Sequence, residues 1–178
     1  MERRRRSKPS TLPYARHLVL LAAAASLPAT ARARCDITPD ATGHVTIPSG
    51  WTTIGDNNRA NSPFYACASL SSVYIPDTVT HIGKSAFRQS GLTELTVPSS
   101  VARIDNKACM DTNIASLSLY AGLLTRISNY AFAENPLTTV VLPDSLNYVG
   151  KGAFRSNDAL EMVFFGDGVT HISDAAFN

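Results

Sequence analysis

This 178-residue sequence lacks the short patterns that mark most enzymes and metal-binding proteins. It has no HExxH pair, no glycine-flanked serine elbow and no paired metal-ligand cysteines. Gly83-Lys84-Ser85 ends like a phosphate-binding loop, but Thr78 stands where that loop needs its first glycine. We therefore predict no enzymatic activity, no catalytic residue, no metal site and no cofactor.

The sequence also lacks an apolar run long enough to cross a membrane. Its longest such run, Leu18 to Leu27, has about ten residues, and a spanning helix needs about twenty. A basic segment containing Arg3 to Arg6 precedes this run, and the small residues of Ala29-Thr-Ala31 and Ala31-Arg-Ala33 follow it. This order is typical of a signal peptide, which we predict over residues 1–33. We therefore expect a secreted, periplasmic or cell-surface protein with no membrane span after cleavage.

Acidic residues outnumber basic residues outside that leader. The full chain has a formal net charge of +2, but cleavage after Ala31 leaves 10 basic and 13 acidic residues. The remaining chain shows no basic stripe of the kind that contacts phosphates. The charge pattern therefore argues against a nucleic-acid partner.

Cysteine is rare too, with three in the chain. Cys35 and Cys67 both lie in the irregular N-terminal region, and an exported chain meets an oxidising compartment. They are our candidates for a disulfide, although spacing alone leaves the pairing open. Cys109 takes a position that other repeats fill with phenylalanine, so we expect a buried thiol.

What the sequence does contain is a repeat of 22 or 23 residues. Each copy has an alternating apolar pair that predicts a short strand, usually a proline that ends it, a second apolar pair and an Ala-Phe pair. We expect five copies over residues 70–178, the last without a polar cap, and an N-terminal cap over residues 34–69 that holds a degenerate first copy and an insertion. The five copies open at Leu70, Leu92, Ile114, Leu137 and Leu160.

The first of these five copies carries a family resemblance. Leu70-Ser-Ser-Val-Tyr-Ile-Pro-Asp-Thr-Val-Thr-His-Ile-Gly-Lys-Ser-Ala-Phe87 resembles the BspA-like, or Treponema pallidum-type, leucine-rich repeat at every signature position. The resemblance implies a repeat solenoid: a right-handed superhelix with a parallel concave β-sheet and short turns, strands or 3-10 helices on the convex side. It also implies an exported protein that contacts other proteins, with adhesion to host extracellular proteins as one such role.

Outward-facing residues of the predicted strands form columns along such a solenoid. One column runs from Thr46 to Phe164, and small hydroxyl residues occupy its middle. Contiguous exposed apolar groups often mark contact sites, although strand propensity also favours such residues. We predict that the partner-binding residues are Tyr74, Tyr120, Val141, Met162 and Phe164. The alternative is a self-assembling structural protein of the cell envelope, in which the apolar C-terminal surface forms a subunit interface or takes up an apolar ligand.

A second column contains His81 and His171 at the same repeat position. Because strands stack about 4.8 Å apart, four repeats separate these histidines by roughly 19 Å, too far to share a metal ion. We expect a solvated convex ladder there, with weak anion binding as the alternative.

Overall fold

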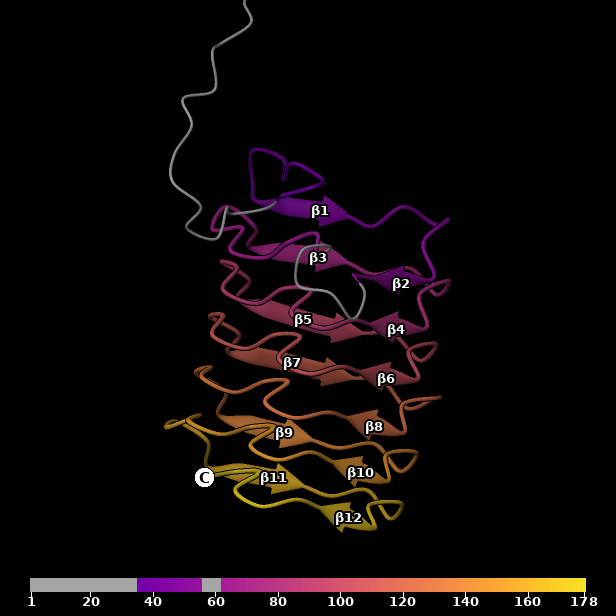
Figure 1. Ribbon diagram of the computed structural model, residues 1–178, viewed down its shortest axis with the longest axis vertical. Helices are drawn as coiled ribbons and strands as arrows, with labels where there is room; N and C mark the ends of the chain where they lie inside the picture. The colour runs from indigo at the N-terminus through magenta and orange to yellow at the C-terminus, as the bar shows by residue number, and fades with distance from the viewer. Residues whose placement is uncertain (1–34, 56–61) are drawn as a thin grey trace, which may run out of the picture. The chain divides into compact units, whose positions relative to one another are not determined.

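The computed structural model describes residues 35–55 and 62–178. These residues form a stack of coils, in which equivalent strands of successive coils lie beside one another (Figure 1). All the described residues belong to one compact unit of the chain, residues 31–178. The predicted signal peptide lies outside the described residues.

Each coil contains one long strand and one short strand (Figure 1). None of the described residues forms a helix, and so none forms a helix able to cross a membrane. The long strands are β1 (His44–Thr46), β3 (Ser72–Tyr74), β5 (Glu94–Val97), β7 (Ser116–Leu119), β9 (Thr139–Val141) and β11 (Met162–Phe164). The short strands are β2 (Thr53–Ile54), β4 (His81–Ile82), β6 (Arg103–Ile104), β8 (Arg126–Ile127), β10 (Tyr148–Val149) and β12 (His171–Ile172).

All strand pairs are parallel, which confirms the predicted repeat solenoid. The short strands form one six-stranded sheet, and the long strands pair as β1–β3, β5–β7 and β9–β11. Each residue lies opposite its repeat equivalent, as Val45 does opposite Val73 and Val140 opposite Val163. Strand β5 stops directly before Pro98, whose ring nitrogen has no hydrogen to donate to the ladder.

Phenylalanine side chains stack along the core of these coils. Ring centroids lie 5.4 Å apart for Phe64 and Phe87, 5.4 Å for Phe132 and Phe154, and 5.2 Å for Phe154 and Phe177. Phe64 belongs to the N-terminal insertion, yet it occupies the phenylalanine position of the first coil. The insertion therefore completes that coil.

Cys109 stands between Phe87 and Phe132 in this column and interrupts the stack. Its side chain is fully buried, as expected, and burial raises the pKa of its thiol. The other two cysteines, Cys35 and Cys67, form a disulfide. This bond ties the residues before β1 to the turn that follows Phe64.

A column of buried polar side chains runs beside the phenylalanines, and sequence reasoning did not identify it. Its members follow the Ala-Phe pair by three residues, and all are buried: Ser90, Thr112, Asn135 and Asn157. The short Ser90 hydroxyl finds no hydrogen-bond partner within the described part of the chain. The longer asparagine side chains reach several.

Asn135 joins two coils through its side chain. Its Nδ2 donates to the backbone carbonyls of Cys109, Phe132 and Ala133 at 2.9, 3.1 and 3.1 Å. Its Oδ1 accepts from the Ile114 N–H at 3.1 Å and from the Thr112 hydroxyl. These turn groups are shut off from water, so the asparagine satisfies polar atoms that would otherwise be costly to bury.

In the five copies that open at Leu70 to Leu160, the residue two positions before the Phe or Cys109 core position is left-handed. Ser85, Lys107 and Tyr130 have φ of 58°, 59° and 58°, although non-glycine residues rarely adopt such values. Gly152 holds the equivalent position with φ of 60°, and a Cβ there would lie 2.6 Å from the Tyr130 ring. Glycine is required at this copy because the tyrosine of the preceding coil covers it.

The last coil differs from the sequence expectation at one residue. The alternation Val163-x-Phe165 predicts that Phe165 is buried, but half of its surface is exposed. The described coils cover this strand from one side only, and Phe165 makes an edge-on contact with Phe177 at 5.7 Å. Ile172 of the same coil is also exposed, and Val163 is partly buried.

The asparagine contacts predict a large stability difference between two Asn→Ala variants. Asn135→Ala strands several buried backbone groups and should lower the free energy of unfolding by about 3 kcal/mol. Asn106→Ala is the control, because exposed Asn106 accepts one bond, from the Asn129 N–H at 3.1 Å, and its loss should cost under about 1 kcal/mol. Urea denaturation followed by circular dichroism measures both. Equal losses would contradict the proposed role of Asn135.

The cysteine environments predict a specific thiol count. The native protein should not react with a thiol-specific disulfide reagent, because Cys109 is buried and its raised pKa keeps the thiol protonated. Denaturation without reductant should reveal Cys109 alone, and reduction should add Cys35 and Cys67. Cys109→Ala should abolish the first signal and leave the second. A reactive native thiol would show that this part of the core is open.

Candidate functional site: the long-strand face

The long-strand face comprises the outward residues of the six long strands and the turn residues directly after them. All five residues predicted to bind a partner lie on it, and each exposes between 50% and 58% of its surface. They are Tyr74, Tyr120, Val141, Met162 and Phe164. The alternation of the strands accounts for this exposure, since the neighbours of these residues point into the core.

The structure places these five residues in two groups. Val141 and Phe164 lie opposite each other in the β9–β11 pair, and Met162 lies two residues before Phe164. We call these three residues the Phe164 cluster. Tyr74 lies at the end of β3, and the exposed hydroxyl residues Thr96 and Ser118 separate it from Val141 in their column.

Tyr74 and Tyr120 instead line one groove. Its volume is about 430 Å³, within the range of small-ligand sites. Strand β3 ends at Tyr74, and Tyr120 directly follows β7, so the coil that contains β5 lies between them. The other residues that line the groove include Asp77, Thr96, Pro98 and Ser99.

Charge is unevenly distributed between the two strand types. Over residues 70–178 we divide each repeat into a long-strand half and a short-strand half, which begins at the first residue of the short strand. The short-strand halves hold all seven lysines and arginines and five acidic residues. The long-strand halves hold no lysine or arginine and five acidic residues, namely Asp77, Glu94, Asp144, Glu161 and Asp167. The long-strand halves over residues 70–178 therefore have a net negative charge.

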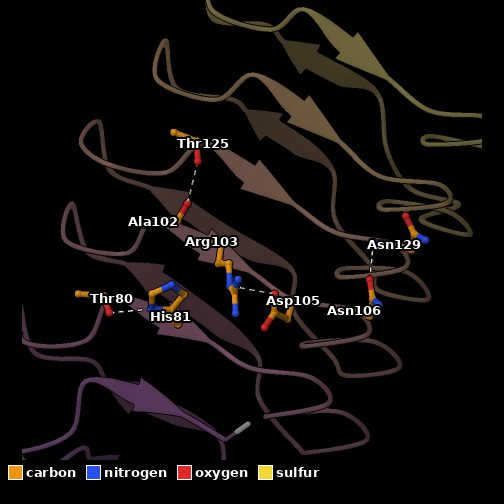
Figure 2. Close-up of polar contacts among 8 residues, drawn as sticks. All are labelled: Thr80, His81, Ala102, Arg103, Asp105, Asn106, Thr125 and Asn129. Atoms are coloured by element: carbon orange, nitrogen blue, oxygen red, sulfur yellow. Dashed lines mark hydrogen bonds and ion pairs between the residues drawn. The ribbon is translucent and has the colours of Figure 1, made fainter. Parts of the chain in front are cut away.

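The short-strand sheet carries the second predicted column. The registers align Thr53, His81, Arg103, Arg126, Tyr148 and His171, as the sequence predicts. Local contacts occupy several of these groups (Figure 2). His81 Nδ1 lies 2.7 Å from the Thr80 hydroxyl, and Arg103 Nε lies 3.3 Å from an Asp105 carboxylate oxygen.

The C-terminal part of this column is a stack of side chains. The Arg126 guanidinium lies 3.8 Å from the centroid of the Tyr148 ring, and that ring stacks on His171 at 4.8 Å. Tyr148 and His171 each contact Ser173 through hydrogen bonds of 3.2 and 3.1 Å. No group of three potential metal ligands occurs among the described residues. We assign the C-terminal part of this column to contacts between coils, because Arg126, Tyr148 and His171 stack on one another.

Sequence reasoning identified the exposed residues but missed the groove and the charge distribution. The groove depends on which turns lie side by side, and one strand pattern does not contain that information. The charge distribution was visible in the aligned repeats. Over residues 70–178, every lysine and arginine lies in the second half of its repeat, after the start of the second apolar pair.

Comparisons with known proteins agree on the type of repeat. A family model described as BspA type leucine-rich repeat region matches residues 57–178 in six copies. A leucine-rich repeat protein from Bacteroides ovatus ATCC 8483 aligns with a TM-score of 0.57 and 26% identity, over 71% of this chain and 34% of that one.

Two further solved structures match less closely in shape. The pneumococcal vaccine antigen PcpA aligns over 51% of this chain and 25% of its own, with 25% identity and a TM-score of 0.47. A leucine-rich cell surface protein from Faecalibacterium prausnitzii A2-165 aligns over 71% and 42%, with 27% identity and a TM-score of 0.40. This chain therefore spans less than half of each solved chain. No curated protein matches the sequence significantly.

Proposed function

Because the chain belongs to the BspA-type leucine-rich repeat family, we propose that it is an exported protein-binding module whose partner docks on the long-strand face. The observation that carries this proposal is the Phe164 cluster. Val141, Met162 and Phe164 lie next to one another on the paired strands β9 and β11, and each exposes at least half of its surface. Solenoids commonly bind partners on an extended sheet surface, and exposed adjoining apolar side chains favour such contacts.

Binding fits this face better than catalysis does. Repeat solenoids of this family are in general non-enzymatic, and the face offers tyrosine, aliphatic and hydroxyl groups. Interface centres are enriched in aromatic residues and methionine and are depleted in lysine. The long-strand halves of residues 70–178 match these three features, since they contain exposed aromatic residues, Met162 and no lysine, but their five acidic residues are not typical of an interface centre.

The proposed location is outside the cytoplasm, either secreted, periplasmic or on the cell surface. The basic leader and the apolar run that follows it support export. The disulfide between Cys35 and Cys67 supports it independently, since such bonds persist mainly in oxidising compartments. Within this proposal, the specific role that we propose is adhesion to host extracellular proteins. These are therefore the proteins to screen for binding.

The Phe164 cluster predicts a charge-sensitive contact. Phe164→Asp should weaken binding at least about tenfold, because it puts a charge at the centre of an apolar contact. Folding should stay intact, since the side chain points away from the core. An array of immobilised extracellular matrix and cell-surface proteins, probed with the purified protein, measures binding. Thr46→Asp is the matched control, because Thr46 is an exposed member of the same column at its other end. Unchanged binding by the Phe164 variant would contradict the proposal.

Self-association is a second candidate, because Phe165 and Ile172 are exposed on the last coil. An oligomer formed through this coil should lose mass in light scattering when Ile172 is replaced by aspartate, and Phe164→Asp should have less effect. A monomer at all concentrations would exclude this candidate. Oligomers that persist in the Ile172 variant would exclude this coil as the interface.

A further inference from the structure

The groove between Tyr74 and Tyr120 combines two exposed aromatic rings with a carboxylate. The coil between the tyrosines contributes Thr96, Pro98 and Ser99 to the lining. Neighbouring strands lie about 4.8 Å apart, so two coil steps separate the tyrosine backbones by at least about 10 Å. The groove volume of about 430 Å³ leaves room for one long side chain.

Elsewhere this chain covers a tyrosine ring with its own cation. The Arg126 guanidinium lies 3.8 Å from the centroid of the Tyr148 ring, a cation–π contact between neighbouring coils. Within the described residues no cation and no other ring contacts Tyr74 or Tyr120. Both tyrosines are therefore more than half exposed and lack the cation partner that Tyr148 has.

Asp77 adds a negative charge to the same groove. Its carboxylate is exposed, and among the described residues it takes part in no hydrogen bond or ion pair. No lysine or arginine occurs in any long-strand half over residues 70–178. An incoming cation therefore meets attraction from Asp77 and no nearby like charge on this face.

We infer that this groove binds a lysine or arginine side chain of the partner protein, held between the tyrosine rings and paired with Asp77. Arginine fits better, because its planar guanidinium stacks on aromatic faces and pairs with a carboxylate through two hydrogen bonds. The inference rests on the proposed function, since it names the chemistry of one contact on that face. The matching partner segment carries a cation for the groove and an apolar side chain for the Phe164 cluster.

Titration of the isotope-labelled protein with short peptides tests the groove directly. The probes are acetyl-Ala-Arg-Arg-Ala-amide, its lysine analogue and an analogue with citrulline, which keeps the shape of arginine and removes its charge. We expect the arginine peptide to shift the NMR signals of Tyr74, Thr96 and Tyr120 at millimolar concentration. The citrulline peptide should bind at least about threefold more weakly, and added salt should weaken only the charged peptides.

Three variants locate the binding energy. Asp77→Asn should weaken arginine-peptide binding about threefold to fivefold, and Tyr74→Leu or Tyr120→Leu about twofold to fivefold. Asp144→Asn is the matched control, because Asp144 also follows a proline after a long strand but lies outside the groove. It should leave peptide binding unchanged.

Each contrary result overturns the inference. Equal binding of the arginine and citrulline peptides would show that charge is not recognised. Shifts confined to another surface, or no shifts at all, would show that the groove takes no cation. The array assay separates this failure from failure of the proposed function. If Phe164→Asp weakens partner binding in the array and Asp77→Asn leaves it unchanged, the proposed function stands and the groove proposal is wrong.

Discussion

Each coil of this protein buries its apolar residues against the next coil, so the strand register between coils is the constraint on which the structure depends. A step of 22 or 23 residues places every side chain beside its equivalent, as Ile82, Ile104 and Ile127 show in the short-strand sheet. A slip of one residue within a strand would turn buried side chains outward. The extra residue of the longer fourth coil therefore lies between its strands, because the registers shift from 22 to 23 residues between Leu119 and Arg126.

Much of the fold could be predicted because register turns one recurring apolar residue into a column. The strands, their parallel pairing and the buried place of Cys109 all follow from that reasoning. The polar column could not be found in this way, because its residue type changes from the hydroxyls of Ser90 and Thr112 to the amide of Asn135. The bonds from the Asn135 amide to buried carbonyls appear only in the three-dimensional turn. The prediction that Phe165 is buried was wrong for a related reason. Alternation indicates which face of a strand a residue lies on, but burial also requires a neighbouring coil.

The candidate site was predictable only in part. Strand alternation correctly gave the outward direction of Val141 and Phe164, since that direction is a local property of the backbone. It treated the five exposed residues as one surface, whereas the structure separates the tyrosine groove from the Phe164 cluster. That separation depends on the small side chains of Thr96 and Ser118 between them. A column of equivalent positions is continuous in geometry, but its chemistry changes at every coil.

The groove lies beside a turn that departs from the repeat pattern. Tyr120 stands at a position that Pro76, Pro98 and Pro143 fill in other copies, and the extra residue of the fourth coil falls in the same turn. A proline there would place a small ring against the strand end, whereas tyrosine extends a large exposed side chain beside Thr96 and Ser99. Strands β5 and β7 keep their register, so the tyrosine does not disturb their pairing. Turns between register-locked strands are therefore the places where this scaffold can acquire recognition chemistry without losing its fold.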